Sequence, residues 1–516
     1  MKRFDGWRGA HDGLTRAVWL AMAAVAMTSC GASSDNAALV PIAPTPTIAV
    51  ASSGSVSAAR GATSNVTITV TRGGGYTGTI ALAATGVPSG VTATFAPATL
   101  TGTAASSALS LTATSIAALA TTSITVEASG TGVATVQTVV ALAVTQPLPV
   151  TLPMLGTGAV PERYTSELWV RGTTAYSSSW GTRGAIRGNA IKIWDVNANV
   201  PTLLDSIVVA DAGTTGDVQV SDDGKLLVVG IEPNANGGLA IYQLDTPRSA
   251  RLLVRTTGGE LRYGVHTVEV ARVNGVLYAF CSIDPASGVP ARLVIMSLAD
   301  PANPTTVASL QMGTPYIHDV FVRDGLLFTA EWNDGVGIWD IGGGGTGGTL
   351  AAPKRIGRVA TVGGQVHNVW WLQDPVTGIK KYLLIGQEGP GTIGSSSIGD
   401  VHVVDMSNMT APVEVARYNV PGAGVHNFSV DEANGLAYAA YYNAGMRVLD
   451  VRGELGTCLA NQKTTDGRCD LTLMGRERAT FSGNGGQYVW GVHFSTSGMF
   501  VSDMLNGLIR VTPATR

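Results

Sequence analysis

The sequence is poor in charged residues for its length. Asp, Glu, Lys and Arg make up only 13% of the 516 residues, and the formal net charge is −3. No long run of Lys or Arg occurs, so the composition gives no basic face for a nucleic acid. The 45% of hydrophobic residues excludes disorder for most of the chain, and the 65 glycines favour a protein rich in strands and turns.

The sequence also lacks the local motifs of common catalytic sites. It contains no Gly-x-Ser-x-Gly nucleophile motif and no His-Glu-x-x-His metal motif. The glycine-rich stretch 342–348 is expected to join two strands, whereas a phosphate-binding loop joins a strand to a helix. These absences leave open whether the protein is an enzyme.

Cysteines are few, and each has a separate interpretation. Cys458 and Cys469 lie eleven residues apart in a polar insertion. In an exported protein they predict a disulfide that closes a surface loop. Metal ligation by this pair is the alternative, although no Cys-x-x-Cys motif and no nearby His supports it. Cys281 lies in the apolar stretch 277–281 and is expected to be buried.

Residues 1–30 are typical of an export signal. Basic residues precede an apolar run, 17–27, that is too short to span a bilayer comfortably. The following Met-Thr-Ser-Cys-Gly segment, 27–31, resembles a bacterial lipoprotein processing site, in which Cys30 becomes the lipidated first residue. The resemblance implies a lipid-anchored protein of the bacterial cell envelope, at the outer membrane or cell surface. The alternative is an ordinary cleaved signal with an incidental cysteine.

Two segments of different character follow the signal. Residues 31–46 consist mainly of Gly, Ala, Ser, Asn and Pro and predict a flexible tether. Residues 47–147 contain about seven short runs of alternating apolar residues, which predict a β-sandwich. The Tyr-Thr-Gly and Gly-Val-Pro-Ser-Gly-Val segments within 76–91 resemble bacterial surface immunoglobulin-like domains. The resemblance implies a spacer or adhesive unit without catalytic chemistry.

Residues 148–516 carry a repeat with a period of roughly fifty residues. The third strand of the repeat is the easiest to recognise, and it occurs at 190–195, 239–244, 293–298, 336–340, 401–405, 446–450 and 508–511. A fourth strand follows six of these copies, and a spare segment, 152–160, precedes the first. The pattern predicts a seven-bladed β-propeller that the N-terminal segment closes. An open β-solenoid is the alternative.

The repeat also resembles a known family. The Pro-Ala-Asn-Pro segment at 301–304 and the Val-Asp-Met-Ser-Asn segment at 404–408 resemble the LVIVD-repeat propellers of bacterial surface proteins. This resemblance extends over 148–516 and implies a propeller fold, but no particular activity. The Ile-Trp-Asp segments at 193–195 and 338–340 give a looser likeness to tryptophan-aspartate repeat propellers.

Four of the seven histidines occupy one repeat position, at the start of the innermost strand beside the expected channel. They are His266, His318, His367 and His426. Second strands end with acids at the same face, and we expect Glu331 and Glu388 to lie near the histidines. Such a set could hold a divalent transition metal, with the two carboxylates as ligands or as partners of ligands. Alternatively, the repeated histidine hydrogen-bonds a neighbouring blade and has only a structural role.

Two functions are compatible with these features. The first is a surface-anchored binding or scaffold module, whose propeller binds a protein, peptide or carbohydrate at the His-bearing mouth of the channel. The second is a metal-dependent enzyme, an oxidoreductase or a lyase, with a His-coordinated metal on the propeller axis. The histidines favour the second function, and the missing catalytic motifs favour the first.

Overall fold

The computed structural model describes residues 43–114, 117–286, 288–392, 395–483 and 485–515. The expected export signal, Cys30 and most of the tether lie outside these residues. The described chain is built of β-strands with two short 3-10 turns, η1 (Gly259–Tyr263) and η2 (Ala460–Gln462), which confirms the all-β prediction. No helix in this part of the chain is long and apolar enough to cross a membrane.

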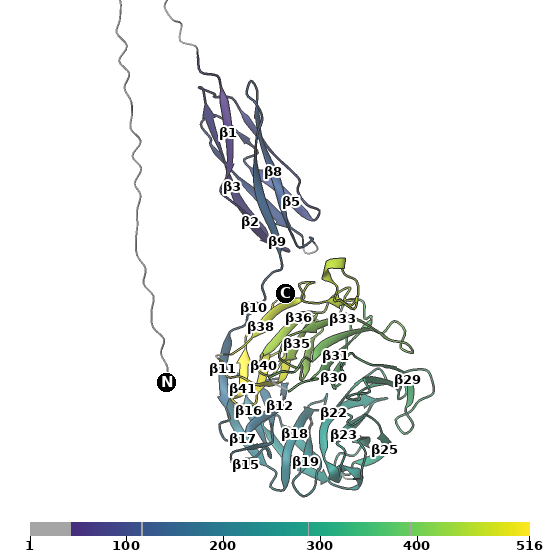
Figure 1. Cartoon of the computed structure of the whole chain (residues 1–516). Coiled ribbons are helices and arrows are strands. Elements are labelled where there is room, and N and C mark those ends of the chain that lie inside the picture. Colours follow the sequence, from purple (N-terminus) through teal and green to yellow (C-terminus); the bar gives the residue numbers. More distant parts are fainter. Residues whose placement is uncertain (1–42, 115–116, 287, 393–394, 484, 516) are drawn as a thin grey trace, which may run out of the picture.

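The first sheets form a β-sandwich (Figure 1). One sheet has the order β1 (Thr47–Ser52), β3 (Thr63–Gly73), β7 (Ser106–Ala113), β5 (Val91–Ala96), and the other has the order β2 (Val56–Ala59), β9 (Val136–Thr145), β8 (Ala120–Gly130), β4 (Ile80–Thr85), β6 (Thr99–Leu100). Alternate residues face inward because side chains alternate along a strand. Val66, Ile68 and Val70 of β3 therefore pack on Ile124 and Val126 of β8 in one core, while the threonines between them face solvent.

The second part is a β-propeller, a ring of antiparallel units that surround a central channel (Figure 1). Its first three units are β12 (Tyr164–Arg171), β13 (Thr174–Trp180), β16 (Ala190–Asp195) and β17 (Thr202–Val208); β18 (Ala212–Val220), β19 (Leu226–Pro233), β20 (Gly238–Thr246) and β21 (Ser249–Thr256); and β22 (Val265–Val273), β23 (Val276–Ile283), β24 (Arg292–Ser297) and β25 (Thr305–Gln311). The first two units are joined by one bridge, Ser179 to Thr215.

The remaining units continue the ring. They are β26 (Asp319–Arg323), β27 (Leu326–Ala330), β28 (Val336–Asp340) and β29 (Lys354–Val359); β30 (Val366–Trp371), β31 (Tyr382–Gln387), β32 (Asp400–Asp405) and β33 (Val413–Asn419); β34 (Phe428–Asp431), β35 (Leu436–Ala440), β36 (Met446–Asp450) and β38 (Glu477–Phe481); and β39 (Val489–Ser495), β40 (Gly498–Asp503), β41 (Gly507–Val511) and β11 (Met154–Ala159). Short strands β10 (Val150–Thr151) and β37 (Cys469–Asp470) extend two of the sheets, and β14 (Thr182–Arg183) pairs with β15 (Ile186–Arg187).

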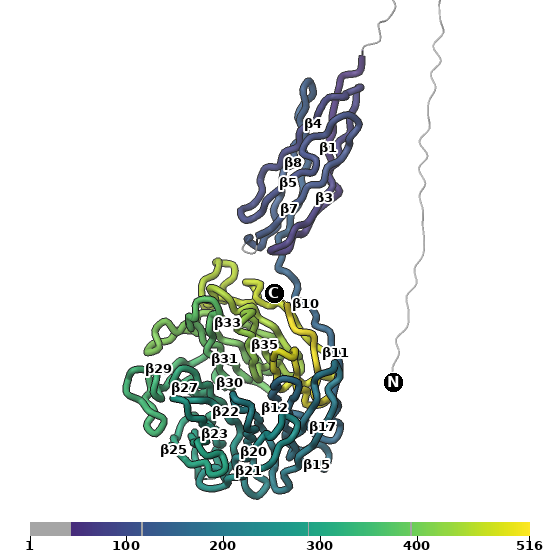
Figure 2. The backbone as a smooth tube through the Cα atoms, turned by 180° about the vertical axis from the view of Figure 1, so that it is seen from behind, coloured from purple at the N-terminus to yellow at the C-terminus, as the bar shows by residue number. Residues whose placement is uncertain are grey.

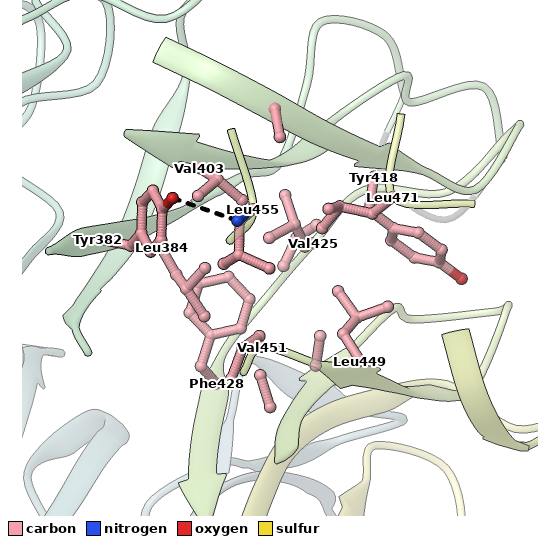
Figure 3. Packing of buried hydrophobic residues seen from close by; sticks show 14 of the residues in the cluster. Tyr382, Leu384, Val403, Tyr418, Val425, Phe428, Leu449, Val451, Leu455 and Leu471 are labelled. Atoms are coloured by element: carbon pink, nitrogen blue, oxygen red, sulfur yellow. Dashed lines mark hydrogen bonds between the residues drawn. The ribbon is translucent and has the colours of Figure 1, made fainter. Parts of the chain in front are cut away.

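Burial explains why the middle strands of the units are almost continuously apolar. Every residue of β27 and β35 is buried, because each sheet is packed between two neighbours. The outer strand β17 is exposed at almost every position. Figure 3 shows one such packing layer, in which Leu384 and Val403 of one unit meet Phe428 and Leu449 of the next.

The ring is closed by its own N-terminal strand. β11, which precedes the first unit, pairs antiparallel with β41, and Gly158 lies opposite Leu508. The segment expected to supply the missing strand, 152–160, therefore contains that strand. Trp194, Phe500 and Leu508 share one buried cluster, which joins the first unit to the last.

An insertion between β36 and β38 lies beneath the sandwich. The structure joins Cys458 and Cys469 of this insertion in a disulfide, with their Cα atoms 5.9 Å apart, and Cys281 is a buried free thiol. The sandwich stands at the rim of the ring above this insertion (Figure 2). Gln146, after the last sandwich strand, donates a hydrogen bond to the carbonyl oxygen of Leu473.

Closure can be tested at Gly158. A Cβ atom there would lie 2.5 Å from Cζ3 of the buried Trp194. We expect Gly158→Val to reduce the free energy of unfolding of the propeller by about 1–3 kcal/mol, because overpacking forces side chains or backbone to shift. Urea unfolding followed by circular dichroism would measure the change. The control is Thr157→Val on the opposite face of the strand, and equal stability of the two variants would contradict this packing of β11.

Candidate functional site

The four repeated histidines lie side by side at one mouth of the channel, which we call the His-bearing mouth. Neighbouring ring centroids are 4.6 Å apart for His266 and His318, 3.8 Å for His318 and His367, and 4.1 Å for His367 and His426. His266 belongs to β22 and His367 belongs to β30. His318 directly precedes β26, and His426 lies shortly before β34. Consecutive units thus place equal repeat positions in an arc.

Aromatic side chains continue the arc. Trp332 stacks on His318 at 5.5 Å, and Trp490 lies 4.4 Å from His426 between ring centroids. Trp332 and Tyr442 both adopt positive φ angles, 45° and 42°, which are uncommon for residues other than glycine. Each is held there by a backbone bridge to the next unit, from Trp332 to Val366 and from Tyr442 to Val489. The strained positions therefore fix two aromatic rings at the mouth.

Two groups of side chains at the mouth have the composition and spacing of metal ligands. In the first group, ligand atoms of His318, His367 and Glu388 lie within 4.8 Å of one another. The second consists of Glu232, His266 and Asp284. His266 Nδ1 lies 2.5 Å from a Glu232 oxygen, and His266 Nε2 lies 3.0 Å from His318 Nε2, so the two groups are in contact.

Several ring nitrogens of the four repeated histidines have no hydrogen-bond partner in the part of the chain that the structure describes. These atoms, all of them buried, are Nδ1 of His318, both ring nitrogens of His367, and Nδ1 of His426. Leaving a buried polar atom unpaired costs about 1–3 kcal/mol. Buried polar groups are otherwise nearly always satisfied, and an exception calls for an explanation such as an ion. The same rings also lie against the backbone of the next unit, His318 at His367, His367 at His426 and His426 at Trp490. Both interpretations, a ligand and a contact between units, are therefore consistent with these surroundings.

Burial determines the charge of these histidines. It lowers the pKa of His318, His367 and His426 well below the usual value, and the proximity of other histidines lowers it further. Burial alone would also lower the pKa of His266, but the charge of Asp284 and the hydrogen bond to Glu232 raise it to about 10. Three of the four imidazoles are therefore neutral at neutral pH, the form that binds metals.

The two predicted carboxylates have different surroundings. Glu388 lies at the mouth, 3.7 Å from His367 Nε2, and accepts a hydrogen bond from the hydroxyl of Tyr442. Burial raises the pKa of Glu388 to about 7. Glu331 is fully buried elsewhere, where it pairs with Arg358 and accepts a hydrogen bond from Thr329.

Glycine explains the position of Glu331. A Cβ atom on Gly337 of β28 would lie 2.4 Å from a Glu331 oxygen, so the missing side chain leaves the space that the carboxylate fills. The structure thus brings Glu388, and not Glu331, to the histidines.

Sequence reasoning did not select Asp284, and it expected Glu232 near the histidines, as an acid at the end of a second strand, without naming it as a ligand. Both lie at or just after the ends of second strands, β19 and β23, at the face that also receives Glu388 from the end of β31. An acid at the end of a second strand was therefore the available signal. This signal does not distinguish these residues from Glu331, because the neighbouring side chains decide whether such an acid reaches the histidines.

Below the mouth, the channel contains a cavity of about 180 Å³ lined by further carboxylates. Burial raises the pKa of Asp217 to about 6 and that of Glu269 to about 7. Asp217 accepts a hydrogen bond of 2.7 Å from the backbone N–H of Val268 in the next unit, and Asp319 accepts one from Val320. These two carboxylates thus satisfy the backbone of the inner strands.

Comparison with known proteins adds only a likeness of fold. No family model matches the chain, and no curated protein matches it. The C-terminal WD40 domain of Sif2 is 11% identical, with a TM-score of 0.43 over 77% of this chain and 93% of that one. Sqt1 from Chaetomium thermophilum is 12% identical, with a TM-score of 0.48 over 71% of this chain and 100% of that one.

A second structure of Sqt1 is bound to the N-terminus of ribosomal protein L10. It is 13% identical, with a TM-score of 0.44 over 70% of this chain and 91% of that one. At these identities and overlaps the matches carry no argument about function. The ring is assigned from the strand pairing of this chain.

The charge of His266 can be tested directly. We expect its imidazole to stay protonated at pH 8, while His318 and His367 are neutral. Glu232→Gln should lower the pKa of His266, because it removes a negative hydrogen-bond partner. NMR of histidine-labelled protein would follow each ring, with Glu414→Gln beside His402 as the control.

The raised pKa of His266 also determines how its contribution to folding stability changes with pH. The folded-state pKa of His266 is raised, so its contribution is complete below about pH 6.5 and is lost as the pH rises towards 10. An imidazole of His266 that titrates near pH 6.5 in the wild type would contradict the ion pair.

Proposed function

We propose that this chain is a binding module whose ligand face is the His-bearing mouth, and that a divalent transition metal forms part of this face. The observation that supports the proposal most directly is the set of buried imidazole nitrogens without partners, beside the carboxylate of Glu388. Imidazole with one carboxylate suits zinc, iron and similar ions, whereas calcium and magnesium prefer oxygen ligands.

The residues that would hold the ion are His318, His367 and Glu388. The two imidazoles are neutral, so no proton has to leave them before a metal binds. Tyr442 would orient Glu388 through its hydroxyl group, as outer partners of metal ligands commonly do. A metal held by three protein groups keeps a position for an external donor. A side chain or hydroxyl group of a protein, peptide or carbohydrate partner is the donor we expect.

The aromatic rings of the mouth fit such a partner. Trp332 and Trp490 flank the histidine arc, and Trp180 lies 5.4 Å from Trp490 between ring centroids. Flat aromatic faces provide large apolar contacts with a sugar ring or a peptide. The metal would orient the partner by binding one of its donor atoms, and the aromatic rings would provide most of the area in contact with it.

The finer assignment of fold and location belongs to the same proposal. The ring is a seven-bladed propeller of the LVIVD type over 148–516, and 47–147 is an immunoglobulin-like spacer. Cys30 is a lipidation site that anchors the chain in the bacterial cell envelope through the tether 31–46. The disulfide in the propeller supports an oxidising compartment.

Metal binding can be tested by removal of the donors. After treatment with a chelator, the protein should take up cobalt(II) or zinc(II) on titration, measured by equilibrium dialysis and elemental analysis. His318→Ala combined with His367→Ala, and separately Glu388→Gln, should weaken binding by at least roughly 100-fold. Glu331→Gln is the matched control and should bind normally, because Glu331 lies in the pair with Arg358.

The same variants distinguish metal binding by His318 and His367 from a purely structural role of these residues. Three of the four ring nitrogens of His318 and His367 have no hydrogen-bond partner among the described residues, and the fourth contacts His266. The metal-free double variant should therefore be nearly as stable as the metal-free wild type. A wild-type protein that takes up no metal, together with a loss of several kcal/mol in the double variant, would overturn the metal proposal.

The lipid anchor can be tested by fractionation. Cys30→Ser should move the protein from the membrane fraction to the soluble fraction, since lipid chains contribute about 0.8 kcal/mol per buried methylene. Ser33→Ala in the tether is the control and should stay with the membrane. A Cys30→Ser protein that remains membrane-bound would contradict the lipoprotein assignment.

A second candidate function is a metal-dependent enzyme, an oxidoreductase or a lyase. The observation that favours it is Glu388, whose raised pKa, near 7, suits proton transfer at neutral pH. Its carboxyl group lies between the hydroxyl of Tyr442 and the ring of His367.

A further inference from the structure

A second cavity lies between the sandwich and the propeller, and its lining includes none of the four repeated histidines. Its volume is about 660 Å³, within the range of sites for small molecules. The walls come from both parts, with Arg60 and Gln146 on the sandwich side and the end of β36, β38 and the disulfide-closed insertion on the propeller side. In Figure 1 the lower end of the sandwich, with β2 and β9, faces this side of the ring.

The lining of this junction cavity is positively charged, although the whole chain is slightly acidic. It contains four arginines and two carboxylates, which leaves two positive charges. Both carboxylates already have cationic partners. Asp450 is bound by Arg452 through two hydrogen bonds, and Glu454 is bound by Lys381 at 2.8 Å. Asp450 also lies 3.7 Å from Nη1 of Arg476, so Arg60 and Arg478 are the arginines of the lining that have no carboxylate partner in the described part of the chain.

Arg60 is the central observation. It is only 6% exposed, yet among the described residues no carboxylate lies within ion-pair distance of its guanidinium. Its Nε donates to the carbonyl oxygen of Ala117 at 2.7 Å, and Nη1 donates to Leu473 at 3.4 Å. Nη2 is buried and has no hydrogen-bond partner within the described ranges. A buried cation with an unused donor is costly unless a ligand completes it.

Two further arginines have donors at the same cavity. Arg478 of β38 has no hydrogen bond or ion pair to its side chain within the described ranges, and it is partly exposed. Arg476 donates to the carbonyl oxygens of Arg452 and Glu454, which fixes the position of its guanidinium. The cavity therefore has one immobile buried guanidinium, one oriented guanidinium and one that is free to move.

We propose that this junction cavity binds a phosphate monoester attached to an apolar body. Guanidinium groups match phosphate oxygens in geometry and form strong charge-assisted hydrogen bonds. A phosphate monoester carries close to two negative charges at neutral pH, which balances the two positive charges of the lining. Leu459 and Met474 in the wall provide contacts for the apolar part, for which a bare phosphate ion has no use.

Phenyl phosphate is a suitable probe, since it combines a phosphate monoester with a small apolar ring. Isothermal titration calorimetry of the purified full chain should give one binding site per chain. Benzyl alcohol, which lacks the charge, should not bind, and benzoate, with one charge, should bind more weakly. No saturable binding of phenyl phosphate, or tighter binding of benzoate, would overturn the proposal.

Substitutions locate the site. Arg478→Gln should weaken phenyl phosphate binding by roughly tenfold or more, because one charge-assisted contact is lost. Arg478 has no hydrogen bond or ion pair to its side chain in the described part of the chain, so this variant should fold and melt like the wild type. Arg60→Gln should have at least as large an effect on binding. Arg248→Gln, at an exposed ion pair elsewhere on the ring, is the matched control and should bind normally.

A soluble ligand and a lipid headgroup share this phosphate chemistry, and vesicles distinguish them. Sedimentation of Cys30→Ser protein with vesicles of phosphatidic acid, but not of Cys30→Ser protein that also carries Arg478→Gln, would assign the site to a lipid. Binding of phenyl phosphate without sedimentation would assign it to a soluble ligand. Binding of phenyl phosphate that is unchanged in Arg478→Gln and in Arg60→Gln would overturn the proposal.

Discussion

The innermost strands of the ring all begin beside one axis, and this constraint shapes the candidate site. Because each unit repeats the same chain path, a residue at one repeat position meets its counterparts in the neighbouring units. His266, His318, His367 and His426 are distant in sequence, yet their rings contact in sequence order. The histidines of neighbouring units therefore form a cluster once the ring has closed, although each of them is only one residue of its own repeat.

This convergence has an energetic cost that the rest of the fold must offset. Buried imidazoles and carboxylates at the axis lose their hydration, and several ring nitrogens gain no protein partner. The fully apolar middle strands, such as β27 and β35, supply the compensating burial further from the axis. The unfavourable chemistry is thus restricted to the region around the axis, and the stabilising contacts lie between the sheets.

Sequence patterns were sufficient for the features that depend on periodicity. The repeat predicted the ring, and the spare segment at its start contains the strand β11 that pairs with β41. The position of the four histidines followed from the repeat as well. Their surroundings did not, because Glu331 and Glu388 occupy similar places in the sequence. Only the space above Gly337 and the proximity of Arg358 place the first of them away from the mouth. The unpaired guanidinium of Arg60 depends on contacts between two parts of the chain, which no local pattern encodes.

The closing strand also constrains how the ring is assembled. β11 is made before any unit of the propeller, whereas its partner β41 is made last, so the two edges are unpaired throughout synthesis. Pairing of such distant segments is slow, since a long loop must close before any contact forms. An unpaired edge is a template for association with other chains. Correct closure would therefore depend on keeping neighbouring copies apart until β41 has been made.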